Sequence, residues 1–525
     1  MGNLRRTRYC GEVRLPDAGQ EMVVAGSIAK CRDKGGIIFA DLRDTTGILQ
    51  LVFDDGTDRD VFAKAQSLRS EYVVIAKGLL RERDAKTTKI ATGDVELYVS
   101  ELRVLSEAET TPFEIRDEVS VKDELRLKYR YLDLRRESMH QPLMVRSRIC
   151  QIVRNYFCDH HFTEIETPIL MKSTPEGARD YLVPSRVQPG RFYALPQSPQ
   201  LYKQLLMLSG FDRYFQIARC FRDEDLRADR QPEFTQIDLE MSFVDDNDIM
   251  TLNEGLIKTL WKEILNVDVA TPFQRMPWDE AMNRFGSDKP DTRFGLEILD
   301  VSEAVRGTEF VPFKAALEAG GTVRCINCKG MADKLTRKNI DKLAADAKTY
   351  GIKGLAYTRL TTENETSSFE KFLTEEEKAA LRAAAGLETG DVLLVAADAN
   401  WVKACTALGQ IRLLVAKNDL IDQSKFNFLW VTDFPLFEYS EEEGRWMAMH
   451  HPFTLPRADC IDKVESDPGA CYAVAYDIVL NGVEMGGGSM RINDPALQQH
   501  MFKALGFTEE RARTCFGFLM DAYRY

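Results

Sequence analysis

The sequence has no run of about 18 apolar residues, so a membrane-spanning helix is not expected. Its start, MGNLRRTRYCGEVRLPD, lacks the apolar core of a signal peptide and the Ser or Thr at the sixth position that N-myristoylation needs. The eleven Cys residues are scattered, and Cys325 and Cys328 form a CxxC pair without a second pair, which argues against zinc. We therefore expect a cytoplasmic protein with reduced thiols and no membrane contact.

The charge balance is acidic, with 69 Lys and Arg against 82 Asp and Glu, a net charge of −13. Such a chain does not bind nucleic acid indiscriminately, so any contact with RNA must be local. At 525 residues the chain is too long for one hydrophobic core, and we expect about three or four domains.

The first hundred residues predict five short strands with a helix between the third and the fourth. This order is typical of an OB-fold barrel, whose sheet face holds single-stranded nucleic acid by stacking bases on aromatic rings beside basic side chains. Phe39 lies in the second strand. From the residues alone it is either a stacking platform or part of the barrel core.

The stretch from Phe221 to Phe243 reads as an antiparallel hairpin with a charged loop. Its second half alternates apolar and polar residues, which predicts a strand with one face on a core. Burying so many charges is costly unless a charged ligand, such as a nucleoside triphosphate, satisfies them. A solvated loop is the alternative.

Taken as a string, this hairpin resembles motif 2 of class II aminoacyl-tRNA synthetases, in the form found in bacterial aspartyl-tRNA synthetases. Other segments resemble the same family in the same order. GGIIFADLRDTTGILQLVF resembles its anticodon-binding barrel, residues 145–170 its motif 1, and residues 476–492 the hairpin that binds Mg²⁺–ATP. Helical spacing and then a strand are expected within residues 145–170.

The resemblance implies a multi-domain α+β fold. It consists of an N-terminal OB-fold β-barrel, a hinge, a class II antiparallel-sheet catalytic domain in two parts, and an α/β insertion domain between those parts. The expected ranges, in that order, are 1–105 for the barrel, 106–135 for the hinge, 136–288 and 426–525 for the catalytic parts, and 289–425 for the insertion.

The function implied by the resemblance is that of an aspartate–tRNA ligase. Such an enzyme is a homodimer that activates L-aspartate with ATP and Mg²⁺ and transfers it to tRNA-Asp. Whether tRNA-Asn is also charged stays open. Arg222 matches the catalytic arginine that stabilises charge on the α-phosphate. Residues that match the ATP-binding set are Arg222, Asp223, Glu224, Gln231 and Glu484.

The remaining matches divide by ligand. The residues expected to bind aspartate are Glu176, Gln200, Lys203, His450 and Arg491. Those expected to hold Mg²⁺ through ATP are Asp477 and Glu484, because Mg²⁺ prefers hard oxygen ligands. Those expected to bind the anticodon are Arg32, Phe39, Gln50, Arg81, Arg83 and Glu96. The histidines His450 and His451 are expected on a strand, pointing opposite ways.

Two features depart from the family pattern. Ser27 stands where Trp is common and Cys31 where a basic residue is common, which puts individual RNA contacts in doubt. After residues 507–525 no motif 3 is found, so we expect a C-terminal truncation and impaired adenylation. An asparaginyl- or lysyl-type ligase is opposed by Arg491 together with Lys203. A non-catalytic tRNA-binding relic is supported by the missing motif.

Overall fold

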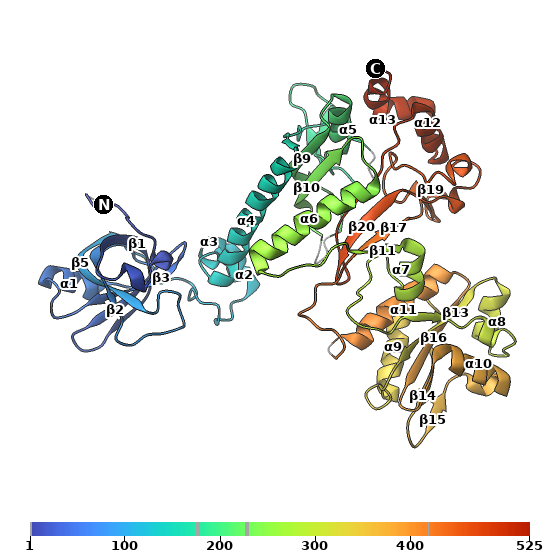
Figure 1. Ribbon diagram of the computed structural model, residues 1–525, viewed down its shortest axis with the longest axis horizontal. Coiled ribbons are helices and arrows are strands. Elements are labelled where there is room, and N and C mark those ends of the chain that lie inside the picture. The colour runs from blue at the N-terminus through green and yellow to red at the C-terminus, as the bar shows by residue number, and fades with distance from the viewer. Residues whose placement is uncertain (1–2, 175–178, 226–229, 418) are drawn as a thin grey trace. The chain divides into compact units, whose positions relative to one another are not determined.

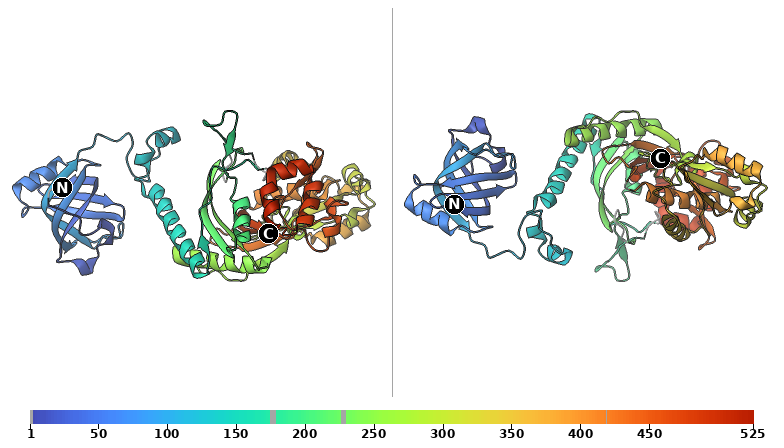
Figure 2. Two further views of the ribbon diagram at one scale, coloured as in Figure 1. Left: turned by 90° about the horizontal axis from the view of Figure 1, so that it is seen from above. Right: turned by 90° about the horizontal axis from the view of Figure 1, so that it is seen from below.

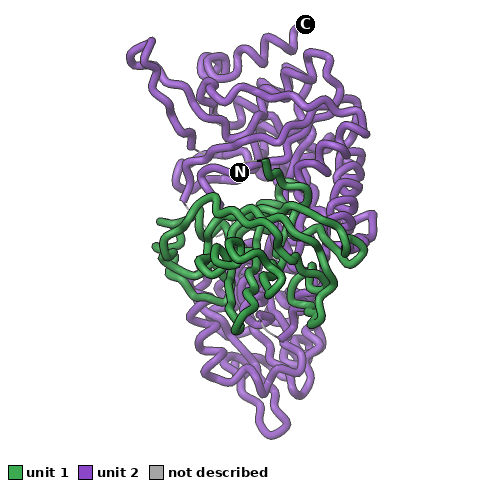
Figure 3. The backbone as a smooth tube through the Cα atoms, turned by 90° about the vertical axis from the view of Figure 1, so that its left-hand side faces the viewer, with its two compact units in different colours: residues 1–147 green, residues 148–525 purple. Residues whose placement is uncertain are grey.

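The computed structural model describes residues 3–174, 179–225, 230–417 and 419–525. The chain divides into two compact units, residues 1–147 and residues 148–525 (Figure 3). Over the described part of the chain, no helix is both long enough and apolar enough to cross a lipid bilayer.

The strands, in chain order, are β1 (Glu21–Asp33), β2 (Ile38–Asp44), β3 (Gly47–Phe53), β4 (Val73–Glu82), β5 (Val95–Ser106), β6 (Thr163–Glu164), β7 (Leu182–Pro184), β8 (Phe192–Ala194), β9 (Arg213–Phe221), β10 (Glu233–Met241), β11 (Gln274–Pro277), β12 (Ile298–Asp300), β13 (Thr322–Cys328), β14 (Ala356–Leu360), β15 (Glu365–Ser367), β16 (Val392–Asp398), β17 (Phe428–Thr432), β18 (Phe437–Ser440), β19 (Arg445–Ala448), β20 (Ala475–Leu480) and β21 (Val483–Ser489).

The α-helices are α1 (Arg59–Ser67), α2 (Asp123–Lys128), α3 (Arg130–Asp133), α4 (Glu137–Asp159), α5 (Gln200–Leu208), α6 (Asp246–Leu265), α7 (Trp278–Phe285), α8 (Val311–Glu318), α9 (Arg337–Thr349), α10 (Glu375–Ala385), α11 (Trp401–Ala416), α12 (Pro495–Ala504) and α13 (Glu509–Ala522). Figure 1 shows their arrangement.

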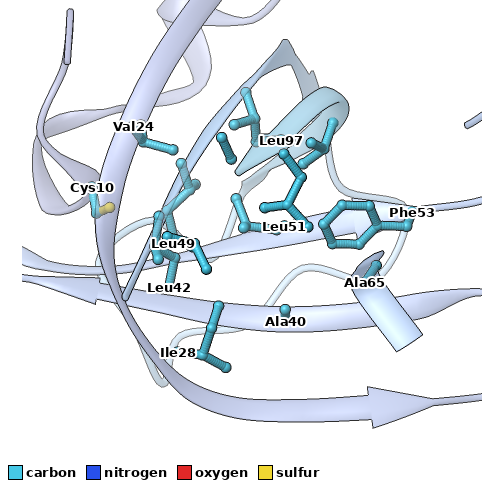
Figure 4. Packing of buried hydrophobic residues seen from close by; sticks show 14 of the residues in the cluster. Cys10, Val24, Ile28, Ala40, Leu42, Leu49, Leu51, Phe53, Ala65 and Leu97 are labelled. Atoms are coloured by element: carbon cyan, nitrogen blue, oxygen red, sulfur yellow. The ribbon is translucent and has the colours of Figure 1, made fainter. Parts of the chain in front are cut away.

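The first unit contains a closed barrel with the strand order β1-β2-β3-β5-β4, and α1 lies between β3 and β4 in the chain (Figure 2). The predicted OB-fold is therefore confirmed. Along β2 the side chains of Ile38, Ala40 and Leu42 are fully buried in the barrel core. Figure 4 shows Ala40 and Leu42 there. Phe39 lies between them in sequence and is only half-buried. Because successive side chains of a strand point to opposite faces, Phe39 is on the outside of the barrel and not in its core.

Two buried carboxylates tie the connector after the barrel into place. Glu71, 3% exposed, accepts from Arg43 of β2 at 2.8 Å and from Arg135 at 2.7 Å. Asp133, fully buried, is surrounded by arginines, among them Arg130 at 2.9 Å. Glu71 joins the connector to the barrel through Arg135, whereas the arginines around Asp133 belong to the connector itself. Breaking a buried pair of this kind leaves an uncompensated charge.

In the second unit, β9 and β10 form the predicted antiparallel hairpin, with Cys220 opposite Phe234. The three-stranded sheet has the order β10-β9-β6, and a four-stranded sheet has the order β11-β17-β20-β21. The strand predicted after α4 is much shorter than expected. Only Thr163–Glu164 pairs, in parallel with β9, and the chain after it leaves the sheet.

Apolar and polar residues alternate along β10, but the burial of the two faces differs from the prediction. Leu239 and Met241 do pack against an apolar cluster that contains side chains of α4 and α6, but Ile237 is 40% exposed. The acidic residues Asp238 and Glu240 are more deeply buried, at 6% and 8% exposure. The polar face of this strand is thus an interior face.

Residues 298–398 contribute a five-stranded antiparallel sheet of order β12-β13-β16-β14-β15. Helices α9 and α11 cover one face and α8 and α10 the other, as Figure 1 shows and the two apolar clusters confirm. Cys325 and Cys328 of β13 belong to opposite clusters, so their thiols face away from each other. They cannot share a metal ion in this arrangement.

Candidate functional site

A buried network of four charges lies in the second unit, at a cavity of about 740 Å³ that these residues line. Lys203 of α5 places Nζ 2.6 Å from Asp238 and 3.5 Å from Glu240. Arg491, two residues after β21, donates from Nε to Glu240 at 3.1 Å and from Nη2 to the other oxygen of that carboxylate at 3.2 Å. The network joins a helix, one strand of the motif 2 hairpin, and the end of a strand in the second sheet.

The charges of this network act on one another. Burial would raise the pKa of the Glu240 carboxyl, but Arg491 and Lys203 together hold it below its usual value. Burial raises the pKa of Asp238 in spite of Lys203. Two cations and two carboxylates make the network neutral overall when all four are ionised.

Asp238 and Glu240 are functional candidates that the sequence prediction missed. Their charges were expected to need a charged ligand, whereas the structure satisfies them with Lys203 and Arg491 of the same chain. A sequence signal did exist, because two acids at alternate positions of a strand that runs between apolar residues occupy the same face. Their partners, 35 and 251 positions away, gave no local signal.

The two histidines have different neighbours from those predicted. His450 lies in a bend and His451 in the irregular segment directly after it, not in a strand, so strand alternation does not separate their rings. Nε2 of His451, which was not predicted as a site residue, is 2.7 Å from Nη1 of Arg491. Nε2 of His450 is 4.0 Å from Asp477, and its ring packs edge-on against Phe434.

Both histidines are neutral at physiological pH. Burial, with a contribution from Arg491, lowers the pKa of His450 to about 4. Burial and the same arginine lower the pKa of His451 well below its usual range. An uncharged imidazole beside the guanidinium avoids repulsion between cations and leaves the positive charge of Arg491 available.

The hairpin of β20 and β21 carries the two carboxylates predicted to hold Mg²⁺. Burial first, and then Glu484 and Asp288, raise the pKa of Asp477 well above its usual value, so the three acids share one electrostatic environment. Gly487 lies opposite Asp477 in the register, and a Cβ there would be 1.9 Å from its Oδ1. The glycine therefore provides the space that the Asp477 carboxylate occupies.

These two carboxylates do not by themselves make a metal site. Among the residues that the structure describes, no three or more His, Cys, Asp or Glu side chains are arranged to hold an ion. Two carboxylates nevertheless fit Mg²⁺, which retains water and takes phosphate oxygens as further ligands instead of an all-protein cage.

The motif 2 hairpin places its predicted residues at the end of β9 and in the loop. The main-chain N–H of Arg222 donates to the Pro232 carbonyl at 2.9 Å, which extends the pairing by one residue, and its guanidinium lies 5.2 Å from the ring of Phe234. Glu224 forms an ion pair with Arg230 at 3.3 Å. Asp223 donates its N–H to the Arg179 carbonyl, and Gln231 is exposed. Glu176 lies outside the described residues.

Several of the predicted residues carry buried polar atoms for which the described residues offer no hydrogen-bond partner. These atoms are Nε of Arg222, Nε2 of Gln200, Nδ1 of His450 and, in the barrel, Oε1 of Gln50. A buried polar group without a partner costs about 1–3 kcal/mol. Such atoms therefore indicate where a polar ligand, or water, completes the hydrogen bonding.

The predicted residues of the barrel share its outer face. Cross-strand pairs connect Arg32 to Phe39, Phe39 to Val52, and Val52 to Tyr98, so these residues form one row over four strands. In the neighbouring rows Gln50 pairs with Asp41 and Arg81 with Glu96. The structure thus brings these predicted residues together around one half-buried aromatic ring.

Ion pairs and one stacked ring order this face. Arg32 binds Asp41 at 2.8 Å, and the Arg81 guanidinium lies 4.1 Å from the ring of Tyr98. The Tyr98 hydroxyl donates to Glu96 at 3.1 Å, and Arg83 is 3.7 Å from the same carboxylate. Asp41 and Tyr98 were not predicted, although both stand at outward positions of strands whose inward positions are apolar.

Comparison with known proteins establishes the family to which the chain belongs. Residues 22–105 match the family described as OB-fold nucleic acid binding domain, and residues 122–525 match tRNA synthetases class II (D, K and N). The chain is 56% identical to an aspartate–tRNA ligase of Agathobacter rectalis and 55% identical to an aspartate–tRNA(Asp/Asn) ligase of Lachnoclostridium phytofermentans. Each alignment covers 100% of this chain and 88% of the relative.

Solved structures agree on the fold. An asparaginyl-tRNA synthetase from Pyrococcus horikoshii complexed with asparaginyl-adenylate aligns over 99% of this chain and 91% of its own, with a TM-score of 0.61 and 18% identity. An aspartyl-tRNA synthetase from Entamoeba histolytica aligns over 100% and 85%, with a TM-score of 0.57 and 18% identity. The expected C-terminal truncation finds no support in these comparisons. The chain belongs to the class II tRNA synthetases of the D, K and N type.

Proposed function

We propose that this chain is an aspartate–tRNA ligase, which activates L-aspartate with ATP and transfers it to tRNA-Asp. The observation that carries the proposal is the buried network of Lys203, Asp238, Glu240 and Arg491. It presents cationic donors and carboxylate acceptors inside one cavity, as an amino acid with a carboxylate side chain requires. The names of relatives more than half identical to the chain support the same reaction.

The proposed division of labour follows the ligand's charges. Arg491 and Lys203 bind the side-chain carboxylate of aspartate, while Gln200, His450 and Glu176 bind the rest of the amino acid. An aspartate carboxylate meets N–H donors with acceptors only. The amide of asparagine would turn its own N–H groups toward those donors and leave them unpaired. Each unpaired buried group costs about 1–3 kcal/mol of binding free energy, which favours aspartate.

Activation is attack of the α-carboxylate on the α-phosphate of ATP, which forms aspartyl-adenylate, breaks the bond between the α- and β-phosphates and releases pyrophosphate. The nucleophile is already ionised, so no general base is needed, and the residues have to stabilise the negative charge that builds on the phosphoryl oxygens. Arg222 has a buried Nε without a partner among the described residues. We assign to Arg222 the role of stabilising the negative charge on the phosphoryl oxygens. Asp223, Glu224 and Gln231 line the nucleotide side. Mg²⁺ bound with ATP would be held by Asp477 and Glu484 and would neutralise phosphate charge.

The outer face of the barrel is the proposed anticodon site. Phe39 supplies a ring for stacking, and Gln50 supplies a buried carbonyl oxygen with no partner in the described part of the chain. Arg32, Arg81, Arg83 and Glu96 surround them. Base stacking on a ring is worth about 1–3 kcal/mol and does not depend on the base, so specificity has to come from the polar neighbours. Charging of tRNA-Asn, which the name of one relative includes, is a further proposal.

Other expectations from the sequence stay proposals. We propose a homodimer, because Ile169 and Leu170, in the segment that resembles motif 1, are 47% and 53% exposed. The domain ranges 1–105, 106–135, 136–288, 289–425 and 426–525 also stay predictions, as does a cytoplasmic location.

Amino-acid binding tests the proposed function without requiring turnover. Calorimetric titration of the chain should show aspartate binding in preference to asparagine. Arg491→Lys should weaken aspartate binding by about 10- to 150-fold, equivalent to the 1.5–3 kcal/mol of a charged hydrogen bond. Arg457→Lys is the matched control, since that arginine forms a 3.0 Å ion pair with Asp433, which does not belong to the network.

Two outcomes contradict the proposal. Equal or tighter binding of asparagine would show that the network does not select a carboxylate. Binding of tRNA-Asp without binding of any amino acid would instead favour the non-catalytic relic.

A further inference from the structure

The insertion domain contains a buried arginine whose contacts lead toward the nucleotide hairpin. Arg412 of α11 is 1% exposed and is the largest fully buried side chain of the described part of the chain. Among the described residues it forms no ion pair with a carboxylate. Burial lowers its pKa to about 10, so it stays charged at neutral pH. Asp291 and Glu297 act on it electrostatically without pairing directly, so its stability in the interior depends on where its donors go.

From Nε and Nη2, Arg412 donates to main-chain carbonyls of one loop. Nη2 donates to Asp291 at 2.7 Å and to Phe294 at 3.0 Å, and Nε donates to Gly295 at 3.2 Å. The guanidinium also lies 4.0 Å from the ring of Phe294. One planar fork thus fixes three carbonyls within five residues, a task for which the single ammonium of lysine is unsuited.

The same loop begins at a point where the backbones of α7 and α11 are in close contact. A Cβ at Gly286, directly after α7, would lie 2.0 Å from the Cys405 carbonyl of α11, and a Cβ at Gly409 would lie 2.6 Å from the Phe285 carbonyl. Only glycine at both positions permits this approach. Helix α11 therefore holds the loop of residues 286–295 at its start and, through Arg412, at its end.

The far side of the loop touches the turn between β20 and β21. A Cβ at Gly482, in this turn, would be 3.2 Å from Cβ of Asp291. The side chain of Asn427 donates to the Thr292 carbonyl at 3.2 Å, while its main-chain N–H donates to Asn481 of the turn at 3.0 Å. Asp288 and Lys289, earlier in the loop, act electrostatically on Asp477.

We propose that Arg412 is a positioning residue for nucleotide binding, through which the insertion domain fixes the loop of residues 286–295 and, by that loop, the hairpin that carries Asp477 and Glu484. The arginine touches no reacting group. It acts by holding a backbone that the hairpin packs against. The nucleotide part of the proposal rests on the proposed function, whereas the mechanical part does not.

Hydrogen–deuterium exchange tests the mechanical part on the intact chain. Arg412→Lys keeps the charge but cannot span three carbonyls, and we expect faster exchange of the amides of β21 (Val483–Ser489) as well as of the loop. Asn427→Ala removes the side-chain hydrogen bond to Thr292, which links the loop to the turn between β20 and β21. It should also give faster amide exchange in β21. Arg359→Lys is the matched control, because Arg359 also donates to a main-chain carbonyl of the insertion domain, that of Ala332 at 2.8 Å.

Ligand titration tests the nucleotide part. Arg412→Lys should weaken Mg²⁺–ATP binding by about 10- to 100-fold, the range seen when residues that orient metal ligands are replaced, and should leave aspartate binding within about 2-fold. A variant that changed exchange in the loop alone, or that weakened aspartate and ATP equally, would overturn the proposal. If no variant and no parent chain binds ATP, the proposed function fails, and β21 exchange still decides the role of Arg412.

Discussion

A methyl group at Gly487 should damage the nucleotide site and spare the amino-acid site. The added Cβ would stand 1.9 Å from Oδ1 of Asp477, whereas real Cβ atoms stay at least 3.0 Å from such an atom. The carboxylate must therefore move by about 1 Å, and replacing residues that orient metal ligands typically costs about 10- to 100-fold in metal affinity. We expect Gly487→Ala to weaken Mg²⁺–ATP binding by about 10- to 100-fold, or about 1.4–2.8 kcal/mol.

The fold should tolerate this change, because the clashing atom is the end of a side chain. Gly486→Ala is a close control: it lies on the same strand, and a Cβ there meets nothing within 4 Å. Titrations with Mg²⁺–ATP and with aspartate, and a thermal melt, compare both variants with the parent chain. Equal ATP affinity in the two variants would refute the argument that Gly487 makes room for a ligand-binding carboxylate. Equal loss of aspartate binding would show that the damage is not local.

Other perturbations address separate links. The pKa of His450, about 4 when folded, lies below its ordinary value, so the unfolded chain binds more protons and the free energy of unfolding should fall by about 1.4 kcal/mol per pH unit from pH 6.5 down to about 4. In His450→Gln, the free energy of unfolding should depend less steeply on pH between 6.5 and about 4, as measured by acid denaturation. An unchanged pH dependence would contradict the burial of His450. Phe39→Ala should weaken tRNA-Asp binding by about 1–3 kcal/mol with little change in melting temperature, while Phe39→Tyr keeps the affinity; a lowered melting temperature would indicate a core role. Ile169→Asp with Leu170→Asp should yield monomers in sedimentation velocity, and an unchanged dimer would place the interface elsewhere.

Periodic features of the sequence were predictable because local chemistry determines them. The barrel strands and the β9–β10 hairpin alternate in sequence as they do in space, and the structure confirms both. The side of the barrel on which Phe39 lies also follows from alternation, once Ile38 and Ala40 are recognised as core residues. The sequence alone left that question open because all three residues are apolar.

Prediction failed where distant contacts outweigh local pattern. Asp238 and Glu240 were taken as the polar side of a strand, yet partners far along the chain make that side an interior one. His450 and His451 were assigned to a strand, but they lie in a bend and the irregular segment after it, where His451 contacts Arg491. In both cases the strand period was applied to residues whose environment comes from other elements.

The charge network also explains how the cavity can be stable before a ligand enters. Two buried cations alone would repel each other and favour unfolding or deprotonation. With Asp238 and Glu240 ionised beside them the network is neutral, and Arg491 is oriented by two bonds to Glu240 and by His451. Aspartate then has to be recognised by the direction of preorganised donors instead of by net attraction, because an uncharged network exerts little long-range pull. That geometry is the property an amide side chain cannot match, since it replaces an acceptor by a donor at a fixed position.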